Sequence, residues 1–206
     1  MRIYAERFLP WIMEKALDRP VFRDQRRTAL LPARGRVLEV GFGFGASLDA
    51  YPAAGVVAVT ALDPNPGMQR RARRRIAGSP VPVRSVRGFA EALPFPRAVF
   101  DTVVSNWTLC SLRHLPESLC EIRRVLAPGG TFLFLEHGLA ASPRLARMQR
   151  FLTPLQRRIA GGCRLDVDIE AAIRSAGFRI EALERYQSAW TPRALAQMCR
   201  GLARPS

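Results

Sequence analysis

A run of closely spaced glycines near two acidic residues carries the most specific chemical signal in this sequence. Gly41, Gly43 and Gly45 come just after Glu39, and Asp63 follows roughly twenty residues later. Glycine at alternate positions lets the backbone turn sharply and lets a ligand lie directly against peptide units. An aspartate at this distance is typical of the acceptor for ribose hydroxyls. The pattern therefore predicts a cofactor that contains a ribose.

The same glycine loop suits two kinds of cofactor. Gly41, Gly43 and Ala46 match the dinucleotide fingerprint of nicotinamide enzymes, in which the loop holds a pyrophosphate. Glu39 argues against that alternative, because a carboxylate two residues before the loop repels a pyrophosphate. It suits instead a ligand with an ammonium group and no phosphate, which describes S-adenosylmethionine and its product S-adenosylhomocysteine. We expect this cofactor and keep a nicotinamide-dependent reductase as the alternative.

Further candidate residues follow the ends of the predicted strands, where parallel sheets bind their ligands. Pro64 and Met68 come just after Asp63 and are expected to flank the adenine, with a helix start and core packing as the alternatives. Asn106, after the fourth strand, is expected to contact the cofactor.

Two residues are catalytic candidates. Trp107 can turn its ring face toward a sulfonium, and core packing is the alternative. His137, after the fifth strand, can take a proton from a bound nucleophile, and a structural hydrogen bond is the alternative. Both are expected on the acceptor side of the site.

The pattern of apolar residues predicts one α/β domain. Short β-branched runs alternate with helices, which is typical of βαβ units and of a parallel sheet covered on both faces. Strands are expected at 36–40, 56–62, 81–86, 100–105 and 131–136, with an antiparallel hairpin at 178–186 and 195–202. Helices are expected at 45–51, 65–77, 115–126, 143–159 and 169–175.

The chain before the sheet is expected to form a separate unit. Residues 1–34 are predicted to hold short helices at 3–17 and 21–31, and residues 35–206 to form the cofactor-binding domain. The apolar residues near the N-terminus favour a mobile lid over the active site. A helix packed permanently on the sheet edge is the alternative.

Composition limits the possible partners. The chain has 206 residues, a length typical of one domain, and a formal net charge of +15. Its basic residues are 31 arginines and one lysine, Lys15, spread along the sequence and not gathered in one motif with stacking aromatics. We therefore expect no nucleic-acid partner, and contact with an anionic membrane surface stays open.

The remaining composition signals concern location and metals. The sequence contains no apolar stretch of membrane-spanning length, and its first residues do not resemble a signal peptide. The four cysteines lie far apart, without the spacing of a zinc motif or a disulfide framework: Cys110, Cys120, Cys163 and Cys199. These signals predict a reduced cytoplasmic protein without a metal.

Five segments resemble the successive motifs of a known enzyme family. They are VLEVGFGFG (37–45), LDPNPGM (62–68), GFAEALPF (88–95), FDTVV (100–104) and RVLAPGG (124–130). Together they look like the class I S-adenosylmethionine-dependent methyltransferases of the UbiE-like group. The resemblance extends from about residue 4 to 205. It implies a single-domain Rossmann-like fold with a mostly parallel seven-stranded sheet, an antiparallel C-terminal hairpin and helices on both faces.

Shorter matches point to one branch of that group. YP (51–52), LCS (109–111), EH (136–137) and GGC (161–163) look like the alkyl thiol S-methyltransferases and their bacterial relatives. The resemblance implies methyl transfer from S-adenosylmethionine to a small apolar acceptor, with a thiol expected. Methyl transfer to oxygen, nitrogen or carbon of a small molecule, quinone or lipid is the alternative. A more distant alternative is a non-catalytic protein that binds anionic surfaces.

The resemblance also assigns roles and shows departures. The backbone N–H of Ala90 is expected to contact adenine, and Phe89 to form a wall of the adenine pocket. Many members have an aspartate at the position of Phe89 that accepts from adenine N6. Phe42 and Phe44 are unusual in the glycine loop. The eukaryotic thiol enzymes carry an apolar membrane-anchoring segment ahead of the domain, which we do not expect here.

Overall fold

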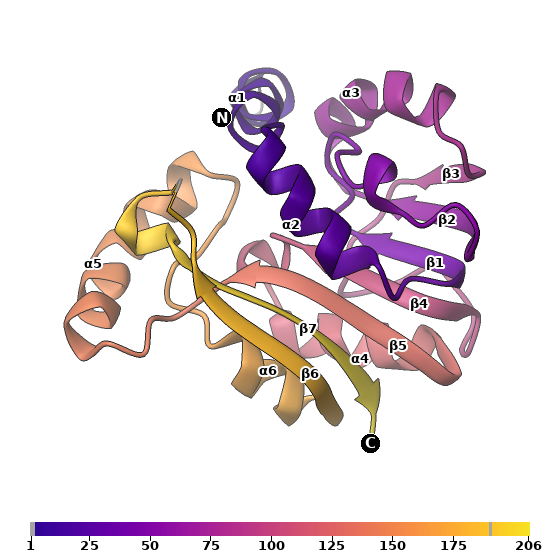
Figure 1. The fold of residues 1–206 in the computed structure, drawn as a ribbon. Coiled ribbons are helices and arrows are strands. Elements are labelled where there is room, and N and C mark those ends of the chain that lie inside the picture. The colour runs from indigo at the N-terminus through magenta and orange to yellow at the C-terminus, as the bar shows by residue number, and fades with distance from the viewer. Residues whose placement is uncertain (1–2, 190) are drawn as a thin grey trace.

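Seven strands form one twisted sheet in the computed structural model, which describes residues 3–189 and 191–206 (Figure 1). The strands are β1 (Gly35–Val40), β2 (Val56–Leu62), β3 (Val83–Val86), β4 (Phe100–Asn106), β5 (Leu126–His137), β6 (Phe178–Gln187) and β7 (Gln197–Pro205). Their order is β3-β2-β1-β4-β5-β7-β6, and β7 is antiparallel to both of its neighbours. The predicted mostly parallel sheet with an antiparallel C-terminal hairpin is confirmed.

Helices cover both faces of this sheet. Those that cover it are α2 (Pro20–Leu30), α3 (Pro66–Ala77), α4 (Leu115–Val125) and α6 (Ile169–Ser175), and the chain also forms α1 (Leu9–Leu17) and α5 (Pro143–Ile159). Strand residues alternate between two cores: Leu38 and Val103 pack with α4 and α6, whereas Val37 and Val104 pack on the face with α2 and α3. The strands are therefore apolar on both faces, as a covered parallel sheet requires.

Two predicted elements differ from the structure. The helix expected at 45–51 is wrong, since only a 3₁₀ turn at Leu48–Ala50 forms there. Gly41, Gly43 and Gly45 all have positive φ angles, which a right-handed helix excludes, so the chain reaches residue 48 before it can coil. Strand β5 begins at Leu126, five residues earlier than predicted, because the Pro128–Gly130 segment continues the strand through a register shift.

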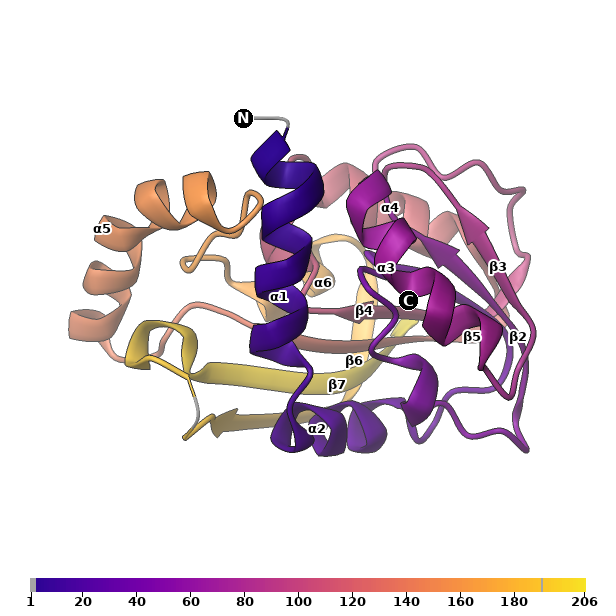
Figure 2. The ribbon, with the colours of Figure 1, turned by 90° about the horizontal axis from the view of Figure 1, so that it is seen from above.

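The N-terminal segment crosses above the strands. Figure 2 looks down on α1, which lies between α5 and α3. A π-helical turn at Tyr4–Phe8 leads into α1. The Tyr4 hydroxyl donates to the carbonyl of Ile159 at 2.6 Å, and the Asn65 side-chain amide donates to the carbonyl of Ala5 at 2.8 Å. The segment is thus bonded to both α5 and the start of α3.

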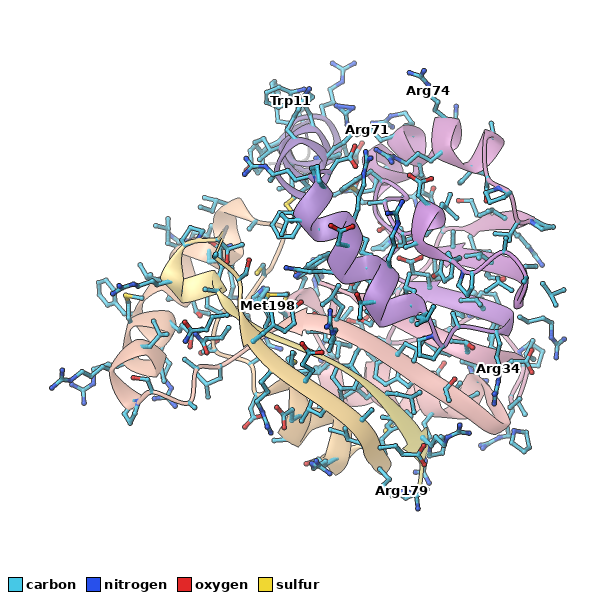
Figure 3. The ribbon with its side chains drawn as sticks, viewed as in Figure 1. Trp11, Arg34, Arg71, Arg74, Arg179 and Met198 are labelled. Atoms are coloured by element: carbon cyan, nitrogen blue, oxygen red, sulfur yellow. The ribbon has the colours of Figure 1, made fainter. Side chains whose placement is uncertain are left out.

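The arginines are distributed over the surface. Figure 3 shows Arg71 and Arg74 on α3, whereas Arg34 and Arg179 lie near other parts of the sheet, so these four basic side chains do not share one face. Arg71 pairs with Glu14 of α1 at 2.9 Å. Among the described residues, no helix is both long and apolar enough to cross a membrane.

Candidate functional site

A pocket of about 360 Å³ lies between the carboxyl ends of β1, β2 and β4 and the underside of α1. We call it the cofactor pocket. Most of the predicted site residues line it: Glu39, Gly41, Gly43, Asp63, Pro64, Met68, Phe89, Ala90, Asn106 and Trp107. Gly45 and His137 do not line it. Gly45 shapes the loop from behind, at a φ of 81°.

Glu39 lies at the base of the cofactor pocket and is almost completely buried. Its carboxylate accepts hydrogen bonds from the hydroxyls of Ser47 at 2.5 Å and Tyr51 at 2.7 Å. Burial raises the pKa of Glu39 to about 7, against the lowering effect of those two hydrogen bonds. Glu39 is therefore a carboxylate that gains from a nearby cation.

A buried cation already lies near this carboxylate. Arg26 of α2 is 2% exposed, and its guanidinium donates to the carbonyl of Leu17 at 3.2 Å. Burial lowers the pKa of Arg26 to about 10, while the nearby charge of Glu39 opposes that shift. The N-terminal helices thus supply charge to the cofactor pocket as well as apolar surface.

Asp63, at the end of β2, closes the other side of the glycine loop. Its carboxylate accepts the backbone N–H groups of Gly43 at 2.8 Å and Asn65 at 2.7 Å. Burial raises its pKa, and these two backbone hydrogen bonds act in the opposite direction. Each carboxylate oxygen keeps a free lone pair, so the group can also accept from two ribose hydroxyls.

Two glycines are required for different reasons. A Cβ at Gly41 would overlap the side chain of Thr108, so this position needs glycine for packing. A Cβ at Gly43 would have no atom nearer than 3.9 Å, and the residue has a φ of 60°. The open space at Gly43 is where a ligand can lie against the peptide backbone.

The side of the pocket expected to hold adenine is built from two loops. Pro64 and Met68 come from the start of α3, and Ala90 is buried behind Phe89. Phe89 is 58% exposed, so it is a wall of the pocket and not a core residue. The departures Phe42 and Phe44 are buried in the loop.

Asn106 provides a test of whether the expected cofactor fits. Its amide nitrogen donates to Ser47 at 3.2 Å, whereas its oxygen is buried without a partner among the described residues. An unpaired buried acceptor is costly unless a ligand donates to it. An ammonium group beside Asn106 and Glu39 supplies that donor, so the residues present fit the methionine end of S-adenosylmethionine.

Trp107 lies on the same side of the pocket as Arg26. The guanidinium carbon of Arg26 is 4.9 Å from the centre of the Trp107 ring, and the Phe22 ring meets it edge-on at 5.6 Å. One face of the ring thus already holds a cation. A contact between Trp107 and a sulfonium stays a prediction for the ring's other face.

His137 lies behind the pocket wall, in a cluster that the sequence analysis does not anticipate. Its Nε2 is 3.1 Å from the sulfur of Cys163, and Cys110 completes a group whose ligand atoms all lie within 4.8 Å of one another. All three side chains are buried. The four cysteines are distant in sequence, but two of them meet here with a histidine.

Comparisons with known proteins identify the family. A family described as a methyltransferase domain matches residues 38–134. Thiol S-methyltransferase TMT1A of Homo sapiens is 30% identical over 185 residues, which cover 82% of this chain and 70% of that relative. The chain belongs to the class I S-adenosylmethionine-dependent methyltransferases. This assignment settles the choice left open by the glycine loop, and the cofactor is S-adenosylmethionine.

Other methyltransferases are similar over different lengths. Demethylmenaquinone methyltransferase of Symbiobacterium thermophilum is 39% identical over 119 residues, which cover 56% of this chain and 46% of that relative. The chain thus spans about half the length of that relative. A solved methyltransferase structure from Thermotoga maritima shares the fold, with a TM-score of 0.70 at 17% identity. The matched region covers 99% of this chain and 98% of the Thermotoga maritima chain.

Several residues of this methyltransferase site are missed by sequence reasoning. Arg26, Ser47 and Tyr51 complete the surroundings of Glu39. Glu136 is buried and accepts from the backbone N–H groups of Thr108 at 3.0 Å and Leu109 at 3.2 Å, so it positions the turn after β4. Ser47 and Tyr51 follow the glycine loop closely, so their polar side chains are a signal that they belong to the site. No such signal lies near Arg26 in the sequence.

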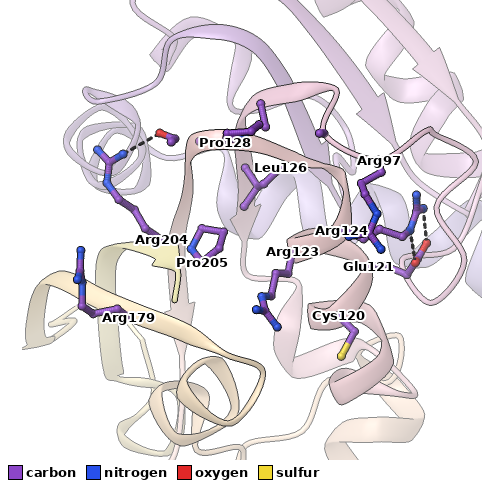
Figure 4. A pocket seen from close by; sticks show the side chains of 14 residues that line it. Arg97, Cys120, Glu121, Arg123, Arg124, Leu126, Pro128, Arg179, Arg204 and Pro205 are labelled. Atoms are coloured by element: carbon purple, nitrogen blue, oxygen red, sulfur yellow. Dashed lines mark hydrogen bonds and ion pairs between the residues drawn. The ribbon is translucent and has the colours of Figure 1, made fainter.

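A larger hollow lies near the amino ends of β4 and β5. It has a volume of about 700 Å³, and we call it the arginine hollow, lined by Arg97, Arg123, Arg124, Arg179 and Arg204 (Figure 4). Arg124 is paired with Glu121 at 2.6 Å, and Arg204 with Glu181 at 2.9 Å. None of the predicted site residues lines it.

Proposed function

We propose that this methyltransferase transfers a methyl group from S-adenosylmethionine to a small apolar acceptor and that a thiol is its preferred acceptor. The observation that carries the proposal is the contrast within the cofactor pocket. Its base is polar around Glu39 and Asp63, whereas α1 covers it with the apolar side chains of Leu9, Met13 and Leu17. An acceptor beneath such a cover is held by apolar contacts.

The reaction asks little acid–base chemistry of the chain. Bound S-adenosylmethionine supplies a methyl group on a sulfonium, whose sulfur leaves as a neutral thioether. Asp63 holds the ribose, Glu39 and Asn106 hold the ammonium, and the apolar cover places the acceptor in line with the methyl. Orientation of this kind supplies several kcal/mol of the lowering of the barrier.

A thiol needs only mild activation. A free thiol with a pKa of about 8.5 is already a few per cent thiolate at neutral pH. Arg26 and Arg113 line the cofactor pocket and favour that anion through their positive charge. His137 does not line the pocket. We therefore propose that the acceptor reacts as its own thiolate, without a strong base from the chain.

We also propose that residues 1–34 act as a lid on the domain formed by residues 35–206. Leu9, Met13 and Leu17 line the pocket from above, so the ligands have to pass this segment. Asn65 donates to the carbonyl of Ala5 at 2.8 Å, and Arg70 donates to that of Glu6 at 3.0 Å. These hydrogen bonds would break when the lid opens and form again when it closes. Closure excludes water and completes the acceptor site.

The proposal is tested with radiolabelled S-adenosylmethionine and a panel of small uncharged thiols, phenols, amines and quinones. Thiols should be methylated fastest, and the rate should rise with pH toward the pKa of each thiol and level off above it. Rapid methylation of a phenol, amine or quinone with every thiol inert would overturn the thiol assignment. The methyltransferase fold and cofactor would still stand.

An anionic membrane surface is the partner that the exposed residues favour. Nine of the twelve exposed large hydrophobic side chains in the described chain lie on residues 3–12 and 148–159: Ile3, Tyr4, Phe8, Trp11, Ile12, Met148, Phe151, Leu155 and Ile159. The hydrogen bond from Tyr4 to Ile159 joins the two segments. Figure 3 shows Trp11 on the outer side of α1. Exposed arginines flank these side chains, as on helices that lie in a membrane interface.

This contact is tested by co-sedimentation with phosphatidylcholine vesicles, with and without phosphatidylserine. Binding should require the anionic lipid and weaken as salt is raised. The double substitution Phe151→Ser and Leu155→Ser should abolish it, whereas Leu31→Ser, at a comparably exposed side chain elsewhere, should not. Equal binding by both variants, or none by the wild type, would contradict the membrane contact.

A further inference from the structure

Three side chains from distant parts of the chain meet behind the wall of the cofactor pocket. Cys110 lies in the 3₁₀ turn after β4, His137 ends β5, and Cys163 follows α5. They are 1%, 5% and 8% exposed. We call them the Cys–His–Cys cluster. No role in the proposed methyl transfer uses them, because none of the three lines the pocket.

The ligand atoms of the cluster have the separation that a tetrahedral ion needs. All of them lie within 4.8 Å of one another, and His137 Nε2 and Cys163 Sγ are 3.1 Å apart. In a zinc tetrahedron with Zn–S of about 2.3 Å and Zn–N of about 2.0–2.1 Å, neighbouring ligand atoms are about 3.5 to 3.8 Å apart. To reach this arrangement, the pair at 3.1 Å has to separate by about 0.5 Å and any pair near 4.8 Å has to approach by about 1 Å.

The three side chains of the cluster have few close polar partners outside it. His137 Nδ1 is buried without a partner among the described residues, so the only polar contact of the ring is with Cys163. Outside the cluster, the sulfur of Cys163 is near the Gln156 amide, at 3.9 Å, and that of Cys110 is 3.6 Å from the Ser111 hydroxyl and 3.9 Å from the Trp107 carbonyl. Contacts this long leave both sulfurs weakly bonded.

Charge favours a divalent ion at this buried position. Two thiolates and one neutral imidazole around Zn²⁺ have no net charge, so the complex escapes the cost of burying an isolated ion. Thiolate and imidazole ligands select a soft or borderline metal over Mg²⁺ or Ca²⁺. We propose that Cys110, His137 and Cys163 bind a single Zn²⁺ ion.

The ion would connect the segments that form one wall of the cofactor pocket. Thr108 and Ser111, on either side of Cys110, line the pocket, and so do Ala160 and Gly161, just before Cys163. The backbone N–H of Arg164 already donates to the carbonyl of Cys110 at 2.9 Å. A shared metal would fix these two turns to the end of β5, independently of which acceptor the enzyme uses.

The test uses the full-length reduced protein, stripped of metal and titrated with Co²⁺ as a spectroscopic substitute for Zn²⁺. A single equivalent should produce the visible bands of a tetrahedral site and thiolate-to-cobalt charge transfer in the near ultraviolet, and Zn²⁺ should displace it. Cys110→Ser and Cys163→Ser should each weaken binding by more than the roughly 10- to 100-fold typical of losing an outer partner. Cys199→Ser and Cys120→Ser, at cysteines outside the cluster, should leave it unchanged.

Two results would overturn the proposal. One is a wild-type protein whose thiols are reduced and whose Co²⁺ spectrum lacks both features. The other is equal loss of binding in the Cys199→Ser control. If the cluster variants fail to fold, the decisive measurement is the zinc content of the wild-type protein and the release of that zinc when its thiols are blocked. Neither readout requires methyl transfer, so failure of the thiol assignment would leave this test intact.

Discussion

The two hollows at opposite ends of the sheet differ in size and in how their polar groups are paired. The arginine hollow has nearly twice the volume of the cofactor pocket, about 700 against 360 Å³. Three of its arginines are paired within the chain, since Glu121 pairs with Arg124, and Glu181 pairs with Arg179 and Arg204. None of the residues lining it is among those with a buried, unpartnered side-chain atom in the described chain.

The cofactor pocket has the opposite character. Asn106 presents an unpaired oxygen, and Glu39 carries a carboxyl whose pKa is raised to about 7 by burial. Glu121 in the arginine hollow has a lowered pKa because Arg124 donates to it. A binding site is therefore marked by polar groups that the protein leaves unsatisfied, more than by the volume of a hollow.

The largest expected effect concerns α1, which covers the cofactor pocket and does not line the arginine hollow. Deleting residues 1–17 should abolish turnover, by about 10²-fold or more, because water enters and the acceptor loses its apolar contacts. The sheet begins only at Gly35, so circular dichroism and thermal unfolding should still show a folded domain.

A single substitution sharpens this prediction. A Cβ at Gly67 would overlap the carbonyl oxygen of Glu6, so Gly67→Ala should lift the lid without touching the pocket. Gly78→Ala, at the other end of α3, meets nothing nearer than 3.7 Å and is the control. Full activity of the deletion variant would show that the segment is no lid.

The second effect compares one carboxylate from each hollow. Asp63→Ala should weaken S-adenosylmethionine binding by about 1.5 to 3 kcal/mol, or about 10- to 150-fold, because the ribose loses a charged acceptor. Glu121→Ala also removes a carboxylate that accepts a backbone N–H, that of Leu93 at 2.8 Å, but should leave affinity unchanged. Calorimetric titration of both variants with S-adenosylmethionine measures this difference. An equal loss of affinity in the two variants would contradict the prediction.

The third effect is a pH dependence of smaller size. Burial raises the pKa of Glu39 from 4.5 to about 7, so a cationic ligand should displace a proton from it. Affinity for S-adenosylmethionine should therefore rise about tenfold from about pH 6 to about pH 8. Titrations in buffers with different ionisation enthalpies should show proton release near pH 6, and Glu39→Gln should abolish it. Affinity that is constant across this range would contradict the prediction.

The two carboxyls should also affect stability in opposite directions. The raised pKa of Glu39 means that its contribution to folding is complete below its ordinary value of 4.5 and is lost as the pH rises through about 7. The lowered pKa of Glu121 means that its contribution is present above its ordinary value and is lost as the pH falls. Measuring the free energy of unfolding of Glu39→Gln and Glu121→Gln as a function of pH distinguishes the two contributions.

The smallest effect compares two glycines with similar backbones. Gly43 in the cofactor pocket and Gly129 at the arginine hollow both have positive φ, and a Cβ at either meets no atom within 3.5 Å. Alanine should destabilise both to a similar extent, by about 1 to 2 kcal/mol. Only Gly43→Ala should weaken cofactor binding, by about 1 kcal/mol, because its methyl group enters the ligand's space. Loss of affinity in both would show that backbone strain alone is responsible.

The cofactor side of the pocket is largely predictable from sequence because short segments form it. Glu39, Gly41 and Gly43 are contiguous with one strand, and Asp63 ends the next, so adjacent parallel strands suffice to bring them together. The predicted helix at 45–51 failed for a related reason: the same glycines that form the loop exclude it.

The opposite wall is not predictable in this way. Cys110, His137 and Cys163 come from three segments that only the finished fold brings together, and their spacing along the chain matches no metal motif. Arg26 likewise reaches Trp107 from a helix that precedes the sheet. Their positions depend on how α2 and the segment after α5 pack on the sheet, which a local pattern does not encode.

The inner position of β7 has a consequence for how the chain is made. Strand β6 is synthesised first, yet within the sheet it is bonded only to β7, which separates it from β5. Until residues 197–205 leave the ribosome, β6 has no partner and the edge of β5 is open. Open edges of this kind invite pairing with other chains. Nascent chains of this enzyme are therefore exposed to such pairing in the interval between synthesis of β6 and insertion of β7.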